Sequence, residues 1–209
     1  LCSWQPDSYA IHRAIYAGND TINASEVEPL SDGLGNRLAG YDGNDVITGS
    51  KGNDIIYGMS GHDYIFAGGG DDVIVGGAGH DIIDGHGGSD LIKGGLGWNI
   101  IECGVDNVRD TIYVAADSFK NKNGNPGGVN ADIITNIDKN DQLYIDGVED
   151  STLTYVENIF HPKAGQFHPH NYSGVDSGVG IYSNGTLEAI VTTVGATSSS
   201  VDQFTTGII

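Results

Sequence analysis

Acidic side chains recur at a constant interval in the middle of this 209-residue chain. The interval is nine residues, and the series runs Asp45, Asp54, Asp63, Asp72, Asp81 and Asp90, followed by Asn99. In a regular structure such carboxylates would stack, and stacked carboxylates repel unless a cation lies between them. Calcium suits this position because it takes about six to eight oxygen ligands, backbone carbonyls included. Magnesium demands a tighter octahedron and zinc prefers Cys and His, so the series predicts calcium.

The aspartates belong to a nine-residue repeat. From Gly40 to Glu102 the chain divides into seven uninterrupted rows: GYDGNDVIT, GSKGNDIIY, GMSGHDYIF, AGGGDDVIV, GGAGHDIID, GHGGSDLIK and GGLGWNIIE. Gly holds the fourth position of every row and Ile the eighth. The Gly-rich half predicts a tight turn, since Gly accepts positive φ, and the residues after the aspartate predict a short strand. Two rows then make one coil of a parallel solenoid, with coils about 4.8 Å apart and the seven Ile in two facing ladders.

The predicted core is too thin to hold the coils together alone. Each coil supplies two Ile, and burying each one contributes about 1.5–3 kcal/mol. Ordering the backbone costs about 1–2 kcal/mol for every residue of the coil. Cations between the aspartates would supply the missing stability. The alternative interpretation is an aspartate ladder that only caps turns, and six charges at one register argue against it.

Residues eighteen apart lie on the same edge of such a solenoid. One edge would carry Asp45, Asp63, Asp81 and Asn99, and the other Asp54, Asp72 and Asp90. The row resembles G-G-x-G-x-D-x-U-x, the calcium-binding nonapeptide of the RTX family of secreted proteins, over about 63 residues. This resemblance implies an all-β fold, a Ca²⁺-bound parallel β-roll (β-solenoid) with a C-terminal antiparallel β cap. It also implies sites that take two carbonyls and the aspartate from each of two loops.

The resemblance implies four well-formed sites in this chain. Asp45 and Asp63 would share an ion with the carbonyls of Tyr41, Gly43, Gly58 and Ser60. Asp63 and Asp81 would use those of Met59, Gly61, Gly76 and Ala78. On the other edge, Asp54 and Asp72 would use Ser50, Gly52, Ala67 and Gly69, and Asp72 and Asp90 would use Gly68, Gly70, Gly85 and Gly87.

Further sites and ligands are expected at the ends of the array. A weaker fifth site would pair Asp81 with Asn99, and Gly77 and Gly79 complete the set of expected ligands. A sixth would pair Asn36 with Asp54, because residues 36–38 continue the register backward. Residues 18–22 resemble a half-row, but 24–35 break the spacing, so we expect a degenerate start and not a full site.

The composition changes after the last row. We expect an N-terminal segment with degenerate repeats (1–39), the roll (40–104), and a β cap with a secretion-signal region (105–209). Residues 110–114, 131–138 and 141–145 predict strands, 120–130 an exposed loop, and Asn184-Gly185 a hairpin turn. Residues 110–145 resemble the D-x-I…D-x-L-x-I segment that closes the roll in secreted RTX proteases. The C-terminal hairpin and VDQFTTGII resemble tails that a type I secretion apparatus reads, which would account for the missing N-terminal leader.

The net charge, the cysteines and the histidines bear on which partners and ligands the chain could bind. A net charge of −19 argues against nucleic acid and anionic membranes as partners, and no stretch reaches the roughly 18 apolar residues of a membrane span. Two cysteines, Cys2 and Cys103, make no disulfide framework and are expected to be unpaired. The histidines at 62 and 80 should stack on one edge with Trp98 above, and those at 161, 168 and 170 cluster. Transition-metal or sugar binding is one interpretation of these histidines, and solvated turn residues the other.

No catalytic constellation stands out, so we expect a module that is not an enzyme. The hypothesis is a calcium-dependent folding and secretion module of a larger protein, secreted or at the cell surface; the first residue, Leu1, fits an excised piece. A carbohydrate-binding module, like those of alginate epimerases, is an alternative. The net charge and the scarcity of basic residues in 40–102, Lys51 and Lys93, count against it. A self-assembling adhesin or surface-layer building block is the third class.

Overall fold

The structure is a computed structural model that describes residues 12–14, 18–29, 33–115, 131–148, 153–159, 178–184, 186–192, 198–203 and 205–208. The loop expected at 120–130, Cys2, and the histidines at 161, 168 and 170 lie outside the described residues. Strands make up nearly all the regular structure of the described part, where α1 (Ser198–Asp202) is the one helix. None of its helices is long and apolar enough to cross a membrane.

The strands form two sheets. Sheet A contains, in spatial order, β1 (His12–Ala14), β3 (Leu34–Asp42), β5 (Asn53–Ser60), β7 (Val73–Ala78), β9 (Leu91–Leu96), β11 (Thr111–Ala115), β13 (Gln142–Asp146) and β17 (Thr205–Ile208). Sheet B contains β14 (Leu153–Ile159), β15 (Gly178–Ser183), β16 (Thr186–Val191), β12 (Asp132–Thr135), β10 (Ile100–Glu102), β8 (Ile82–Asp84), β6 (Tyr64–Phe66), β4 (Val46–Thr48) and β2 (Thr21–Asn23).

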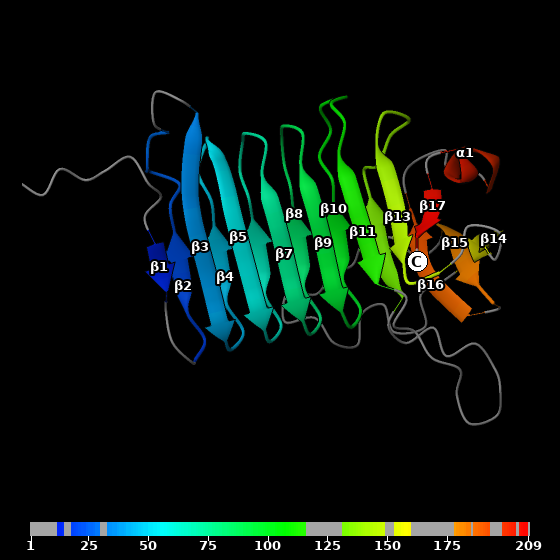
Figure 1. Ribbon diagram of the computed structural model, residues 1–209, viewed down its shortest axis with the longest axis horizontal. Helices are drawn as coiled ribbons and strands as arrows, with labels where there is room; N and C mark the ends of the chain where they lie inside the picture. Colours follow the sequence, from blue (N-terminus) through cyan, green and yellow to red (C-terminus); the bar gives the residue numbers. More distant parts are fainter. Residues whose placement is uncertain are drawn as a thin grey trace, which may run out of the picture.

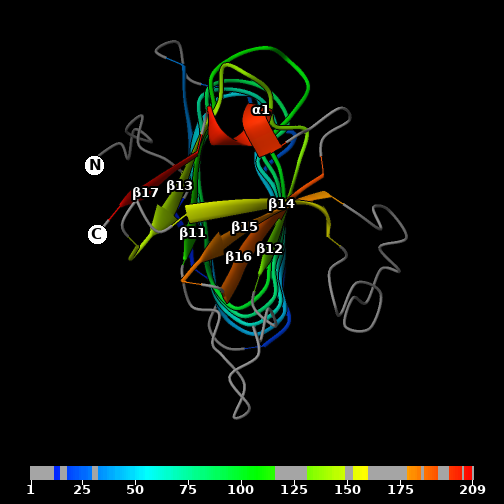
Figure 2. The same cartoon turned by 90° about the vertical axis from the view of Figure 1, so that its right-hand side faces the viewer.

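The chain alternates between the sheets, so each pair of rows makes one coil (Figure 1). Neighbouring strands along the array pair in parallel, with residues eighteen apart in register: Ile56 pairs with Ile74, and Ile65 with Ile83. Figure 2 looks along the coils and shows a flattened section with one sheet on each side. The parallel β-roll predicted from the rows is confirmed.

The core is a pair of apolar ladders between the sheets. Strand residues alternate between the two faces, which turns the eighth position of every row inward. The sheet A ladder is Leu38, Ile56, Ile74, Ile92, Ile112 and Leu143. The sheet B ladder is Ile22, Ile47, Ile65, Ile83, Ile101, Ile134 and Val191. Each of these side chains is at most 1% exposed. The seven predicted Ile are all present, and the ladders extend beyond them at both ends.

The C-terminal end contains the expected antiparallel strands together with further parallel strands that lengthen the roll. Within the described residues, antiparallel pairing joins β14 to β15 and β15 to β16. By contrast, β11, β12, β13 and β17 pair in parallel and lengthen the roll. The physical reason is that Ile112, Ile134 and Leu143 continue the inward ladders. Figure 2 shows β14–β16 and α1 lying across this end of the coils, where an uncovered last coil would expose apolar surface.

Candidate metal centre

Asp and Asn side chains form two columns, one along each line of turns. The first column lies at the start of the sheet B strands and contains Asp20, Asp45, Asp63, Asp81, Asn99 and Asp132. The second column precedes the inward residues of sheet A and contains Asn36, Asp54, Asp72, Asp90, Asp110 and Asp141. Both predicted edges are thus assembled as the spacing indicated.

One hydrogen bond repeats along each column. The backbone N–H of each member donates to Oδ1 of the next, as from Asp63 to Asp81 at 2.9 Å and from Asp54 to Asp72 at 2.7 Å. Because this donor fixes one carboxylate oxygen, the orientation of the other oxygen is fixed as well. The columns are therefore preorganised by the backbone of the adjacent coil.

The other carboxylate oxygen has no protein partner in most of the array. Asp45, Asp63, Asp72, Asp81 and Asp90 are each at most 2% exposed. In each of the five, Oδ2 is buried without a hydrogen-bond donor among the residues that the structure describes. A buried carboxylate oxygen without a partner is costly, so each of these positions needs a positive group.

Four of these five rows begin with glycine, and in them a backbone carbonyl from the next coil lies beside this oxygen of Asp45, Asp63, Asp81 and Asp90. A Cβ added to Gly76 would stand 2.6 Å from Asp81 Oδ2 and 2.6 Å from the Gly94 carbonyl oxygen. A Cβ added to Gly58 would clash in the same way with Asp63 Oδ2 and stand 2.5 Å from the Gly76 carbonyl. Glycine at the first position thus leaves a gap bordered by two oxygens. Calcium binds oxygens at about 2.3–2.6 Å, so this gap suits it.

The turns that present the expected carbonyls share an unusual backbone. The second position has positive φ in six rows: Tyr41 (77°), Met59 (83°), Gly68 (105°), Gly77 (118°), His86 (72°) and Gly95 (98°). Three of these residues are not glycine, and a bulky side chain seldom adopts this conformation. Such backbone persists only where the surroundings determine it, and it clusters at binding sites.

The row that begins at Gly49 departs from this pattern. Neither Ser50 nor Gly52 is among the described residues with positive φ. The amide of Ser50 donates to Asp54 Oδ2 at 2.6 Å, and its hydroxyl lies 3.1 Å from the same oxygen. The backbone N–H and the side-chain amide of Asn36 both donate to Asp54 Oδ1. The structure therefore brings the predicted pair Asn36 and Asp54 together, but protein donors already occupy both oxygens of Asp54.

Four column members were missed by the nine-residue spacing: Asp20, Asp110, Asp132 and Asp141. Loops of other lengths separate them from the array, so their neighbours lie 25, 20, 33 and 31 residues away. A signal for them does exist in the sequence. Each aspartate stands two residues before an inward Ile or Leu, as in Asp110-Thr-Ile112.

Comparison with known proteins agrees with this geometry. A family model of the RTX calcium-binding nonapeptide repeat matches residues 32–65, 39–74 and 66–101. Residues 32–101 are RTX calcium-binding repeats. Searches of curated proteins and of solved structures each found no match to the chain. The match begins before the first row, in keeping with Asn36 as a member of the second column.

RTX repeats bind calcium and are not enzymatic. Within the described residues, no three or more His, Cys, Asp and Glu side chains converge as they would around zinc. An ion in this RTX array would therefore have two side chains and several backbone carbonyls as ligands. That oxygen-only donor set is the one that calcium accepts and zinc does not.

The RTX columns are electrostatically strained without a cation. Burial raises the pKa of Asp63 to about 6, of Asp81 and Asp90 to about 7, and of Asp72 to about 8. Neighbouring carboxylates contribute to the raised pKa values, and the backbone hydrogen bond to each carboxylate opposes the rise. A divalent ion between coils would remove this repulsion.

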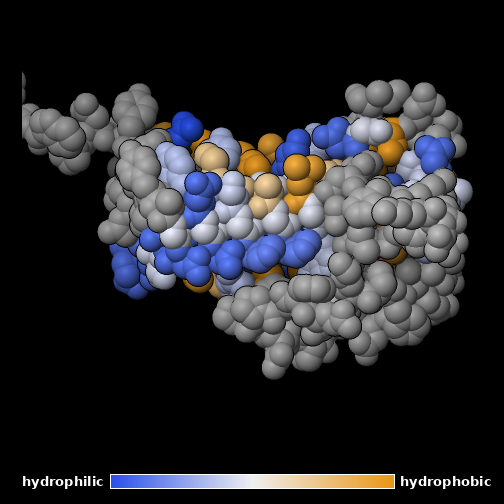
Figure 3. Space-filling model, turned by 90° about the horizontal axis from the view of Figure 1, so that it is seen from below, coloured by the Kyte–Doolittle hydropathy of each residue, from blue (hydrophilic) through white to orange (hydrophobic). Residues whose placement is uncertain are grey.

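A second ladder lies outside the first column of the RTX array. The rings of His62 and His80 stack at 4.9 Å, and Trp98 lies 5.7 Å from His80. Nδ1 of each histidine accepts the backbone N–H of the residue above, at 2.8 and 3.0 Å. The predicted stacking is confirmed, and Nδ1 of both histidines is used in a backbone hydrogen bond between coils. Figure 3 views this line of turns and shows a continuous hydrophilic row along it.

Cys103 lies at the end of the RTX array. Within the described part of the chain it is a free thiol, 1% exposed. Burial raises the pKa of this thiol well above its usual value. A buried thiol held in its protonated form is a poor nucleophile, so Cys103 acts as a core residue.

Proposed function

We propose that this chain is a module that folds on calcium outside the cell and supports the type I secretion and the stability of a larger secreted protein. The observation that supports the proposal is the row of buried Oδ2 atoms in the two columns. RTX repeats are associated with proteins secreted by type I systems. The folding step and the export step are each testable on the full chain.

Calcium at extracellular levels is sufficient to decide whether such an array folds. Extracellular modules bind calcium with dissociation constants of about 10⁻⁴–10⁻³ M. At ten times that constant each site adds about 1.4 kcal/mol, and the four predicted sites together add roughly 6 kcal/mol. A domain is stable by about 5–15 kcal/mol in total. In low calcium the uncompensated columns would keep the array unfolded, the state that can thread through a secretion channel.

The ligands that we propose follow the column geometry. The ions would lie between Asp45 and Asp63, Asp63 and Asp81, Asp54 and Asp72, and Asp72 and Asp90, with a weaker one between Asp81 and Asn99. The carbonyls of the glycine-rich turns would complete each shell. Asp54 would contribute least, because Ser50 already donates to Asp54 Oδ2 at 2.6 Å.

Circular dichroism during a calcium titration tests the folding step. The full chain should show little strand signal in chelator and a cooperative gain as calcium reaches the millimolar range. Magnesium at the same concentration should not reproduce the gain, because magnesium keeps its waters. A spectrum that does not change when chelator is added would refute the folding proposal.

Export tests the second step separately. Cells with a type I apparatus should release the chain, and a chain without residues 178–209 should stay inside. Release of both chains would show that the C-terminal segment carries no secretion signal. That result would leave the calcium proposal intact.

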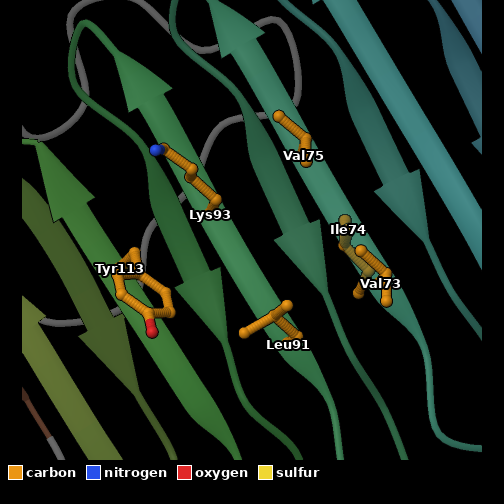
Figure 4. A pocket seen from close by; sticks show the side chains of 6 residues that line it. All are labelled: Val73, Ile74, Val75, Leu91, Lys93 and Tyr113. Carbon is orange, nitrogen blue, oxygen red and sulfur yellow. The ribbon is translucent and has the colours of Figure 1, made fainter.

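Carbohydrate binding is the second candidate, and the outer face of sheet A favours it. A shallow hollow of about 220 Å³ lies there, lined by Val73, Ile74, Val75, Leu91, Lys93 and Tyr113. Figure 4 shows that these residues come from β7, β9 and β11. The Tyr113 ring stacks on Tyr144 at 5.0 Å, which would extend the apolar floor. Binding of the chain to immobilised polysaccharides, and its loss in Tyr113→Ala, would support this candidate.

A further inference from the structure

The second column continues past the last nonapeptide. We propose that it binds one more calcium ion, between Asp90 and Asp110, in a turn that the family match at 32–101 does not include. The inference rests on the proposed calcium coordination by the columns. It adds a site formed partly by non-repeat sequence, residues 103–110.

Asp90 has an unused oxygen directed toward this turn. The residue is 2% exposed, and its Oδ2 finds no hydrogen-bond donor in the described part of the chain. A Cβ added to Gly85 would lie 2.7 Å from Asp90 Oδ2 and 3.1 Å from the Cys103 carbonyl oxygen. Gly76 shows the same arrangement inside the array, 2.6 Å from Asp81 Oδ2 and from the next carbonyl. The Cys103 carbonyl therefore takes the place that a repeat carbonyl takes elsewhere.

The backbone after Cys103 also follows the repeat. Gly104 has a φ of 118°, as the second position of a row does, and a Cβ there would clash with the His86 carbonyl. Gly68, at the second position of a regular row, has a φ of 105°, and a Cβ added there would clash with the Ser50 carbonyl. The turn thus begins as an RTX turn although its sequence has left the consensus.

Asp110 closes the turn in the position of a column member. The backbone N–H of Asp90 donates to Asp110 Oδ1 at 2.9 Å, and Thr111 is in register with Leu91. The interval from Asp90 to Asp110 is twenty residues and not eighteen. The longer turn is held by Asp106, whose carboxylate accepts the N–H of Gly88 at 2.7 Å and of Val108 at 2.8 Å. Asp106 braces the turn, and Asp110 is the ligand.

Two corresponding positions nearer the C-terminal end of the columns do not offer such a site. In the first column a Cβ added to Gly94 would face Asn99 Nδ2 at 2.8 Å, and an amide NH₂ cannot bind a cation. At the end of the second column, Asp141 accepts the N–H of Asp110 at 2.9 Å and of Asp138 at 2.6 Å, one on each oxygen. The unused oxygen of Asp90 distinguishes the site that we propose.

Counting bound ions by native mass spectrometry tests the site on the full chain. Asp110→Asn keeps the Oδ1 acceptor for Asp90 and removes the charge, so this variant should bind one calcium ion fewer than the parent. Asp71→Asn is the matched control, because Asp71 is exposed and lies outside the column. The control should keep the parent number. An Asp110→Asn chain that binds as many ions as the parent would overturn the inference.

A third variant separates this inference from the proposed function. Asp72→Asn alters a predicted repeat site and should lose calcium. If it does so while Asp110→Asn does not, the repeats bind calcium and the extra site is wrong. If neither loses calcium, the proposed function fails too.

A measurement without substitution covers the case in which Asp110→Asn does not fold. Crystals of the unmodified chain soaked with terbium should give an anomalous peak between Asp90 and Cys103. Peaks in the nonapeptide turns without one at this position would overturn the inference.

Discussion

The backbone N–H of Asp45 donates to Oδ1 of Asp63 at 2.9 Å, across one coil of the roll. This bond turns Asp63 Oδ2 toward the gap beside Gly58 and the Gly76 carbonyl. The same backbone that builds the parallel sheet therefore aims the carboxylates. Because the bond needs an acceptor and not a charge, asparagine at position 63 would keep the orientation and remove the ligand charge.

Asp63→Asn should weaken calcium-dependent folding. Asp63 belongs to two predicted sites, so the calcium concentration at the folding midpoint should rise about tenfold or more, equivalent to at least about 1.4 kcal/mol. Circular dichroism across a calcium titration measures the midpoint. Asp42→Asn, an exposed residue on the same edge, makes the same charge change and should leave the midpoint in place. Equal shifts in both variants would point to net charge and not to coordination.

The metal-free chain should become more stable as the pH falls from 8 to 6. Burial raises the pKa of Asp72 to about 8 and of Asp81 and Asp90 to about 7, above the ordinary value of 3.8. The folded state then binds more protons than the unfolded state, so lowering the pH favours folding. Circular dichroism in chelator at pH 8, 7 and 6 measures the trend, as a gain in strand signal at the lower pH.

Calcium affinity should follow the opposite trend with pH. Protons compete with the ion for the same oxygens, so binding should weaken as the pH falls through about 8 to 6, the range of the raised pKa values. Isothermal titration at pH 8 and pH 6 gives the comparison. An affinity that does not change between them would show that these carboxylates are not the ligands.

Gly58→Ala should remove calcium sites without straining the backbone. Gly58 is not among the residues with positive φ, but a Cβ there would stand 2.5 Å from the Gly76 carbonyl and clash with Asp63 Oδ2. We expect the loss of at least one ion and destabilisation of about 1–3 kcal/mol. Gly69→Ala is the control, since the nearest atom to its added Cβ is 3.9 Å away. Ion counting and thermal unfolding of both variants test this.

Ile83→Ala should destabilise the calcium-loaded roll by about 2–5 kcal/mol, because it opens a cavity in the sheet B ladder. The side chain is fully buried, whereas Leu91 on the outer face is 40% exposed. Leu91→Ala should therefore cost clearly less. Chemical denaturation in excess calcium measures both, and equal losses would contradict the ladder as the core.

Much of this architecture could be predicted from sequence because one nonapeptide builds half a coil. The nine-residue interval determines which Ile side chains stack on one another. It also determines which aspartates lie on the same edge of the roll. The members outside that interval could not be found this way. Asp110 and Asp132 join the columns through loops of other lengths, and only the pairing of Thr111 with Leu91 and of Ile133 with Ile100 restores the register.

The difference at Asp54 has another origin. Ser50 occupies the second position of its row, and its amide and hydroxyl both reach the carboxylate. The turn also packs against Pro29, 2.7 Å from a Cβ added to Gly52. Spacing alone gives no information about either contact, because the first depends on side-chain chemistry and the second on a segment outside the repeat.

We propose that ions between buried aspartates of adjacent coils hold the roll together. Hydrogen exchange of the full chain, resolved by mass spectrometry, tests it most directly. Peptides from residues 40–102 should be strongly protected in millimolar calcium and should exchange as an unfolded chain in chelator. Equal protection of these peptides in chelator and in calcium would contradict the account.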